Sequence, residues 1–144
     1  MNNHCTMPMI YQNSTQECCV ASLAMILEYY GKSVPYSLIC EKTITFDEKG
    51  TTYTTATHIL RAAKDFDLDC HGFKRATEKL AKTELPCILH WKTNQFIVLE
   101  KVDKDWFWVC DPTMGRRKLS QEEMDAGFTG VLLTFHPTEQ FLPD

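Results

Sequence analysis

The sequence predicts an α+β fold in which a helical N-terminal half packs on an antiparallel sheet. Three observations support this prediction: a long apolar segment of helix formers near the N-terminus, short runs of branched and aromatic residues after position 69, and turn residues that join those runs as hairpins. Helices followed by antiparallel strands are the α+β order. The 144 residues suffice for one domain with its own core.

Residues 18–30 predict a central helix. They read CCVASLAMILEYY, are apolar nearly all round, and stop at Gly31, a residue type that commonly follows a helix end. A helix that is apolar on all faces must be buried. A short second helix is expected over residues 35–42, and a third over residues 55–66, where apolar residues recur at helical spacing.

Short strands and hairpin turns are expected in the second half of the chain. The expected strands are residues 70–74, 87–91, 96–102, 106–110 and 131–135. Turns at residues 92–94 and 103–105 predict consecutive antiparallel hairpins, and Ser120 with Glu123 reads as a capping box that opens a small helix. We expect one domain over residues 1–144, with residues 1–11 as an N-terminal extension and residues 137–144 as the start of a linker.

Composition narrows the function classes. A net charge of -4, from 15 Lys+Arg and 19 Asp+Glu, gives no electrostatic reason to expect nucleic acid or anionic lipid as a partner. The longest apolar stretches fall far short of the roughly 20 residues of a spanning helix, and the N-terminus has no export signal. We therefore expect a soluble domain that stays inside the cell.

Cysteine usage predicts reduced thiols and no bound metal. The seven cysteines are an odd number and form no C-x-x-C pair. Cys87 and His90 form a C-x-x-H pair, but no second pair completes a tetrahedral site. We expect no metal and no cofactor.

Cys18 is the candidate nucleophile. It lies at the start of the predicted central helix, where unpaired backbone N–H groups and the helix dipole are expected to lower the pKa of a thiol. Gln12, six residues upstream, has the spacing of a papain-type glutamine whose amide donates to the oxyanion. The alternative is that Cys18 is a small buried residue, as most free cysteines are.

The segment from Gln12 to Gly31 resembles the opening motif of the cysteine peptidase domain that removes double-glycine leaders in bacteriocin-exporting and lantibiotic-exporting ABC transporters. In that family Gln, five residues, Cys and Gly precede a small and apolar helix that ends in Tyr-Tyr-Gly. The resemblance continues in chain order through Gly50-Thr-Thr, Pro86-Cys-Ile-Leu-His-Trp91, Asn94-Gln-Phe-Ile-Val-Leu99, Asp111-Pro-Thr-Met-Gly115 and Phe128-Thr-Gly-Val131. It covers nearly the whole chain and implies a papain-like fold.

The resemblance also implies a departure at the catalytic histidine. In the family an Asn-His-Phe segment supplies the general base, and the Asp of Asp-Pro-x-x-Gly orients it. Asp111 matches, whereas position 95 holds Gln95. An amide forms hydrogen bonds but cannot accept the thiol proton or deliver it to the leaving amine. Losing such a base typically costs a factor on the order of 10⁴ to 10⁶, so we expect impaired or absent hydrolysis.

Other residues near the motif are expected to have structural roles. Cys19 stands where the family has Gly and is interpreted as a packing residue. His90 belongs to a Leu-His-Trp strand that the family also shows, so a structural role is favoured over that of a substitute base. No motif recommends His4, His58, His71 or His136 as the base.

The resemblance implies that this domain binds the amphipathic leader helix of a precursor peptide and cleaves after a Gly-Gly pair. Its partners would then be the transmembrane and ATPase domains of an ABC transporter, on the cytoplasmic side of the bacterial membrane. One alternative is a non-catalytic, peptidase-like docking domain that binds export cargo. Another is a thiol-dependent acyl or peptide transferase on the same scaffold.

Overall fold

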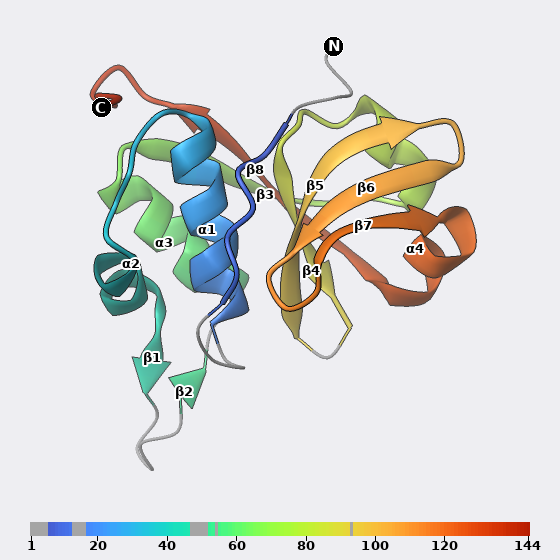
Figure 1. Ribbon diagram of the computed structural model, residues 1–144, viewed down its shortest axis with the longest axis horizontal. Coiled ribbons are helices and arrows are strands. Elements are labelled where there is room, and N and C mark those ends of the chain that lie inside the picture. The colour runs from blue at the N-terminus through green and yellow to red at the C-terminus, as the bar shows by residue number, and fades with distance from the viewer. Residues whose placement is uncertain (1–5, 13–16, 47–51, 54, 93) are drawn as a thin grey trace.

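The computed structural model describes residues 6–12, 17–46, 52–53, 55–92 and 94–144, and places a group of helices beside a six-stranded antiparallel sheet (Figure 1). Residues 13–16, Gly50 and Thr51 of the sequence motifs, together with His4, lie outside the described residues. The α+β prediction is confirmed. The helical half comes first in the chain and the sheet second.

The helical half consists of α1 (Cys18–Tyr29), α2 (Tyr36–Thr43) and α3 (Ala56–Asp65). All three agree with the predicted helices to within one or two residues. α1 is buried from Cys18 to Leu27, as its uniformly apolar sequence requires. Gly31, just past its end, has φ of +96°, a backbone conformation that glycine adopts without steric cost.

The sheet has the strand order β3-β8-β4-β5-β6-β7, and every pairing is antiparallel. The strands are β3 (Leu68–Lys74), β4 (Cys87–Trp91), β5 (Gln95–Asp103), β6 (Trp106–Asp111), β7 (Gly115–Ser120) and β8 (Phe128–Pro137). Two elements lie beside it, η1 (Thr77–Lys82) and α4 (Gln121–Gly127), while β1 (Thr45–Phe46) pairs with β2 (Thr52–Tyr53). The predicted strands are all present, and the predicted capping box of Ser120 and Glu123 opens α4.

Strand β7 was not expected from the sequence. Its residues read GRRKLS, and only Gly115 and Leu119 are buried. Three consecutive basic residues give no strand signal, but pairing along the whole length of β6 satisfies the backbone at this edge of the sheet.

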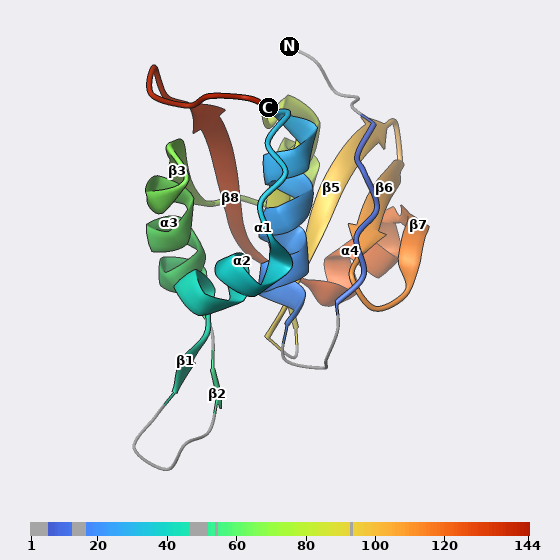
Figure 2. The same cartoon turned by 60° about the vertical axis from the view of Figure 1, so that its left-hand side comes forward.

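Two hydrophobic cores lie on opposite faces of the sheet, and β5 contributes to both. Phe96 and Val98 pack in the core that contains α1, whereas Ile97 and Leu99 pack in the second core with Met124 of α4. This alternation follows from the two-residue period of a strand. Figure 2 shows α1 beside β5, with β6, β7 and α4 extending beyond it. The first turn of α1 therefore lies at the junction of the two halves.

Both end segments pack against the body. Residues 6–12 run as an extended chain past α1 towards the turn between β6 and β7 (Figure 2), and Met7 is buried. After β8, Phe141 joins the first core, and the backbone N–H of Ser33 donates to Asp144 at 2.8 Å. No helix in the described part of the chain is long and apolar enough to cross a membrane.

Candidate active site

Cys18 occupies the first turn of α1, where the helix contacts the start of β5. The backbone N–H of Phe96 donates a hydrogen bond to the cysteine sulfur, and the Ser22 hydroxyl donates to the carbonyl oxygen of Phe96 at 3.0 Å. One strand residue is thus bonded to two successive turns of the helix. Gln95, the exposed first residue of β5, shares with Phe96 the peptide bond whose N–H contacts the sulfur.

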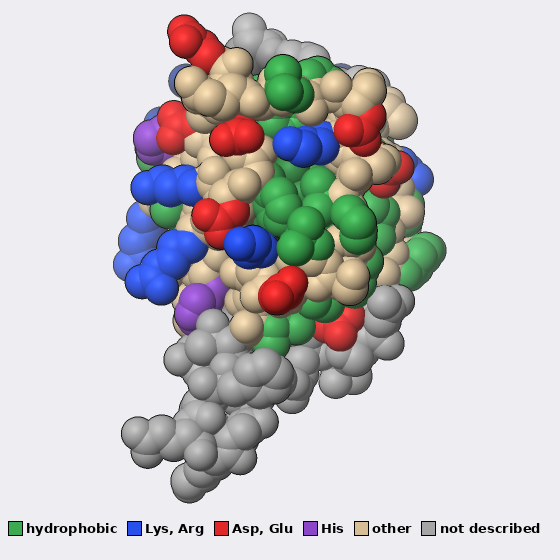
Figure 3. Space-filling model, turned by 90° about the vertical axis from the view of Figure 1, so that its left-hand side faces the viewer, with side chains coloured by type: hydrophobic (Ala, Val, Ile, Leu, Met, Phe, Trp, Pro, Cys, Tyr) green, Lys and Arg blue, Asp and Glu red, His purple; other side chains and the backbone are tan. Residues whose placement is uncertain are grey.

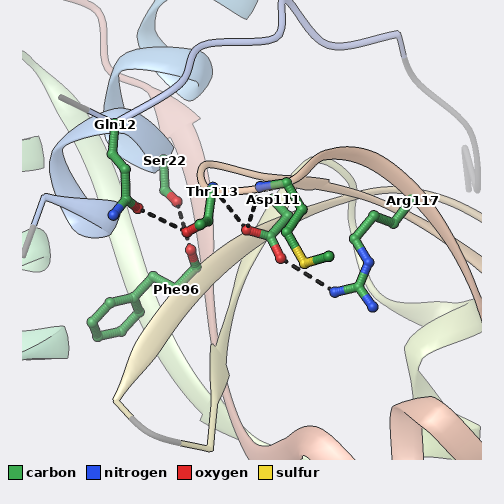
Figure 4. Close-up of polar contacts among 7 residues, drawn as sticks. Gln12, Ser22, Phe96, Asp111, Thr113 and Arg117 are labelled. Atoms are coloured by element: carbon green, nitrogen blue, oxygen red, sulfur yellow. Dashed lines mark hydrogen bonds and ion pairs between the residues drawn. The ribbon is translucent and has the colours of Figure 1, made fainter. Parts of the chain in front are cut away.

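Gln12 is held by the turn between β6 and β7. Its backbone N–H donates to the carbonyl oxygen of Pro112 at 3.0 Å. Its side-chain oxygen accepts a hydrogen bond from the Thr113 hydroxyl at 3.3 Å (Figure 4). Because the amide is held by its oxygen, the amide nitrogen is the end that can donate to another group.

Asp111 ends β6 and is buried, with 6% of its surface exposed. One carboxylate oxygen accepts the backbone N–H groups of Thr113 at 2.9 Å and Met114 at 3.3 Å. The other forms an ion pair with Arg117 at 3.3 Å (Figure 4). The carboxylate is therefore oriented by its own turn and by the neighbouring strand β7.

The Cys18 thiol has a raised pKa, so the prediction of a lowered pKa is wrong for this chain. Burial raises the pKa most, because it penalises the charged thiolate. The backbone N–H groups of Phe96, Cys19 and Cys18 oppose this effect, and the negative charge of Asp111 raises the pKa further. The helix start does supply N–H donors, but desolvation outweighs them, and Cys18 is a neutral thiol near pH 7.

The four candidate residues come from separate parts of the chain. Cys18 belongs to α1, Gln12 to the N-terminal segment, Asp111 to the end of β6 and Gln95 to the start of β5. The contacts of Phe96 join α1 to β5, and the charge of Asp111 acts on Cys18. The catalytic roles of all four residues remain predictions.

Sequence reasoning missed Thr113, Arg117 and Ser22, which hold the candidate residues in place. Thr113 follows the Asp-Pro pair, and an Asp that accepts a backbone N–H two residues later is a recurrent turn, so a local signal existed. Arg117 lay in an unpredicted strand. The one sequence signal for Ser22 was its spacing: it lies one helical turn after Cys18, so both residues share a face of the helix.

The described histidines have identifiable contacts. His90 contacts Thr129 through Nδ1 and Asn94 through Nε2, both at 3.0 Å, and its ring packs on Phe96. His58 closes a capping box with Thr55 at the start of α3. His71 contacts Asp69 at 3.1 Å, and His136 contacts Glu84 at 2.7 Å.

Cys19 is fully buried beside Cys18 in the first core. Its interpretation as a packing residue agrees with this position. Within the described ranges, no group of three or more His, Cys, Asp or Glu side chains lies close enough together to hold a metal ion.

A buried helix with cysteine in its first turn, docked on an antiparallel sheet that carries an aspartate at a strand end, is the architecture of papain-like cysteine peptidases. The model of the Peptidase C39 family matches residues 6–140. The chain belongs to this family. Helices packed on a six-stranded sheet are therefore the expected arrangement.

Two curated relatives illustrate the relationship. The chain is 33% identical over 134 residues to the colicin V secretion/processing ATP-binding protein of Escherichia coli, covering 93% of this chain and 19% of that protein. It is 31% identical over 140 residues to the lactococcin-G-processing and transport ATP-binding protein of Lactococcus lactis subsp. lactis, covering 93% and 19%. The chain spans about a fifth of the length of these relatives.

Solved structures show the same fold. A double glycine motif protease from an AMS/PCAT transporter, crystallised in complex with the leader peptide, superposes with a TM-score of 0.86 at 36% identity, covering 95% of this chain and 96% of that one. The peptidase domain of Streptococcus ComA superposes with a TM-score of 0.79 at 23% identity, covering 90% and 98%. At that lower identity the likeness concerns the fold.

Proposed function

We propose that this chain binds the leader of a double-glycine precursor peptide and holds the bond after the second glycine against Cys18. The observation that carries the proposal is the docking of the first turn of α1 on β5, where the Phe96 N–H contacts the Cys18 sulfur. Gln12, held by Pro112 and Thr113, is the proposed oxyanion donor. We also propose that Gln95 takes the place of the family histidine.

Gln95 affects catalysis because peptide hydrolysis by a thiol requires two proton transfers. Attack by the thiol on a peptide carbonyl requires an acceptor for the thiol proton, and release of the amine requires a donor. A carboxamide does neither, while the raised pKa of Cys18 leaves little thiolate near pH 7. Cleavage is therefore slow, although binding and positioning of the peptide are retained.

An apolar groove supports recognition of a leader helix. It has a volume of about 430 Å³ and lies between α3, β3 and β8. Its lining residues are Ala56, Thr57, Leu60, Gly72, Phe73, Lys74, Val131 and Leu133. Figure 3 shows the face of the molecule that carries α2 and α3, where apolar side chains gather among charged ones. An amphipathic helix binds such a groove through apolar anchors at helical spacing.

A transporter context is the second part of the proposal. The relatives are named as transport and processing ATP-binding proteins, of which this chain matches about a fifth. We propose that transmembrane and ATPase domains are its partners, and that it works on the cytoplasmic side of the membrane.

A non-catalytic docking domain is the competing candidate, and two observations favour it. Gln95 cannot transfer the proton, and Asp111 is already paired with Arg117. In that case the domain retains cargo for export without cutting it.

Mass spectrometry of a synthetic leader peptide with a Gly-Gly pair separates the two candidates. The Gln95→His protein is expected to release the leader at that bond, whereas the unchanged chain forms the complex and releases little. Gln95→Asn is the matched control, since it also carries an amide, and Gln95→His with Cys18→Ser removes the nucleophile. A folded Gln95→His protein that binds the peptide and leaves it intact would support the docking domain instead.

A further inference from the structure

The N-terminal segment that carries Gln12 is tied to the sheet at two places. One tie is the hydrogen bond from the Gln12 N–H to the Pro112 carbonyl in the turn between β6 and β7. The other lies five residues earlier, at Met7, which is 1% exposed. Both ties therefore fix the same short extended segment.

The second tie is built from two side chains of the sheet. The backbone N–H of Met7 donates to Glu100 at 3.1 Å. Arg116 donates to the same carboxylate at 3.2 Å, and its terminal nitrogen donates to the carbonyl oxygen of Met7. Glu100 and Arg116 thus bind both backbone groups of one residue, as a neighbouring strand would.

Glu100 reaches this position because it is the extra residue of a β-bulge. The pairing of β5 with β6 shifts between Leu99, opposite Val109, and Lys101, opposite Trp108, so no β6 residue stands opposite Glu100 in the strand register. Bulges redirect a side chain relative to the regular alternation. The Glu100 carboxylate is buried, and it also accepts a hydrogen bond from the Cys110 thiol at 3.5 Å.

A buried carboxylate is unfavourable unless donors surround it. Donors to Glu100 come from the N-terminal segment, from β6 and from β7, and the contribution of the segment, the Met7 N–H, depends on this register. A shift by one residue would move Gln12 by about 3.3 to 3.6 Å along the chain direction. Such a shift exceeds the tolerance of an oxyanion donor, whose distance must be held to within about 0.5 Å.

We infer that Glu100 and Arg116 are positioning residues for Gln12. Strand β5 contacts Cys18 through Phe96 and the N-terminal segment through Glu100, so one strand fixes the nucleophile and the oxyanion donor relative to each other. Arg116 is the second residue of β7, shortly after the turn that holds Gln12, and it contacts both Glu100 and Met7. This inference rests on the proposed function, because it takes Gln12 as the oxyanion donor.

A double-mutant cycle in the Gln95→His protein tests the inference. Arg116→Met is expected to lower kcat for leader cleavage by about 10-fold to 100-fold with little change in KM, because the donor is displaced while leader binding is retained. In a Gln12→Ala background the same change is expected to lower kcat by roughly 2-fold or less, since its effect passes through Gln12. Arg116→Lys, which keeps a charged donor, should recover part of the loss.

Lys118→Met is the matched control, because Lys118 is a basic residue of the same strand that lies over the rings of Trp106 and Trp108. It should leave kcat unchanged in both backgrounds. Equal losses from Arg116→Met with and without Gln12 would overturn the inference.

Hydrogen exchange on the chain with Gln95 in place keeps this test separate from the proposed function. Arg116→Met should speed hydrogen exchange of the backbone N–H of Gln12 by about 10-fold or more. Exchange of the backbone N–H groups in the second core should stay unchanged. Unchanged exchange at Gln12 would contradict the inference even if the Gln95→His protein proved inactive. Faster exchange in an inactive Gln95→His protein would count against the proposed function alone.

Discussion

Asp111 and Glu100 are two carboxylates with the same exposure, 6%, and each is paired with a neighbouring arginine of β7. They differ in their backbone donors. Asp111 receives N–H groups from its own turn, two and three residues away, whereas Glu100 receives the N–H of Met7, 93 positions away. Of these two carboxylates, Asp111 is the one whose negative charge raises the pKa of the Cys18 thiol. The proposed roles differ accordingly: Asp111 is assigned to the chemistry at Cys18, and Glu100 to holding distant segments in register.

The largest expected difference concerns catalysis. In the Gln95→His protein, Asp111→Asn should lower kcat by about 10⁴-fold, because an amide no longer orients the imidazole through a charged hydrogen bond. Glu100→Gln keeps an acceptor for the Met7 N–H and should lower kcat far less. Single-turnover cleavage of the leader peptide measures both. Comparable losses would show that the two carboxylates do not have separate roles.

For the free energy of unfolding, we expect substitution of Glu100 to have a larger effect than substitution of Asp111. Glu100→Ala removes the acceptor of the buried Met7 N–H and the ion-pair partner of Arg116, and we expect it to lower the free energy of unfolding by about 2 to 4 kcal/mol. Asp111→Ala should lower it by about 1 to 2 kcal/mol, because Thr113 and Met114 are exposed and water can replace the lost acceptor. Urea titration gives both values. A larger effect at Asp111 would contradict the structural role assigned to Glu100.

The smallest expected effect concerns the Cys18 thiol. Asp111→Asn removes a negative charge that raises the pKa, so it should lower this pKa, although burial still holds it above the ordinary thiol value. More thiolate is then present at a given pH, and alkylation by iodoacetamide should be faster. Glu100→Gln should leave the alkylation rate unchanged. The rate at Cys18 is followed by peptide mass spectrometry, with Cys18→Ser as the blank; a slower reaction in Asp111→Asn would refute the assigned sign.

Much of the fold could be predicted because the signals were local. The helix over residues 18–30 followed from its uniformly apolar composition, and the strands of β4, β5 and β6 followed from runs of branched and aromatic residues between turn signals. β7 could not be predicted, since Arg116, Arg117 and Lys118 become a strand only through pairing with β6. In β7, pairing with the neighbouring strand outweighs the low strand propensity of the basic residues.

The site divides in the same way. Cys18, Gln12 and Asp111 were named as candidates from motif and spacing, and their catalytic roles stay predictions. Glu100 carried no signal, because its partner Met7 is distant in sequence and its bulge depends on pairing with β6. The pKa of Cys18 was predicted with the wrong sign, since the helix start is a local feature whereas burial comes from the packing of α1 on β5.

The central claim is that Cys18, Gln12 and Asp111 are positioned to cleave a double-glycine leader, and that cleavage is slow because Gln95 replaces the general base. The single-turnover rate constant for leader cleavage, compared between Gln95→His and the chain with Gln95, tests it most directly. We predict an increase on the order of 10⁴-fold or more with unchanged leader affinity. Equal rate constants in two folded, leader-bound proteins would contradict it.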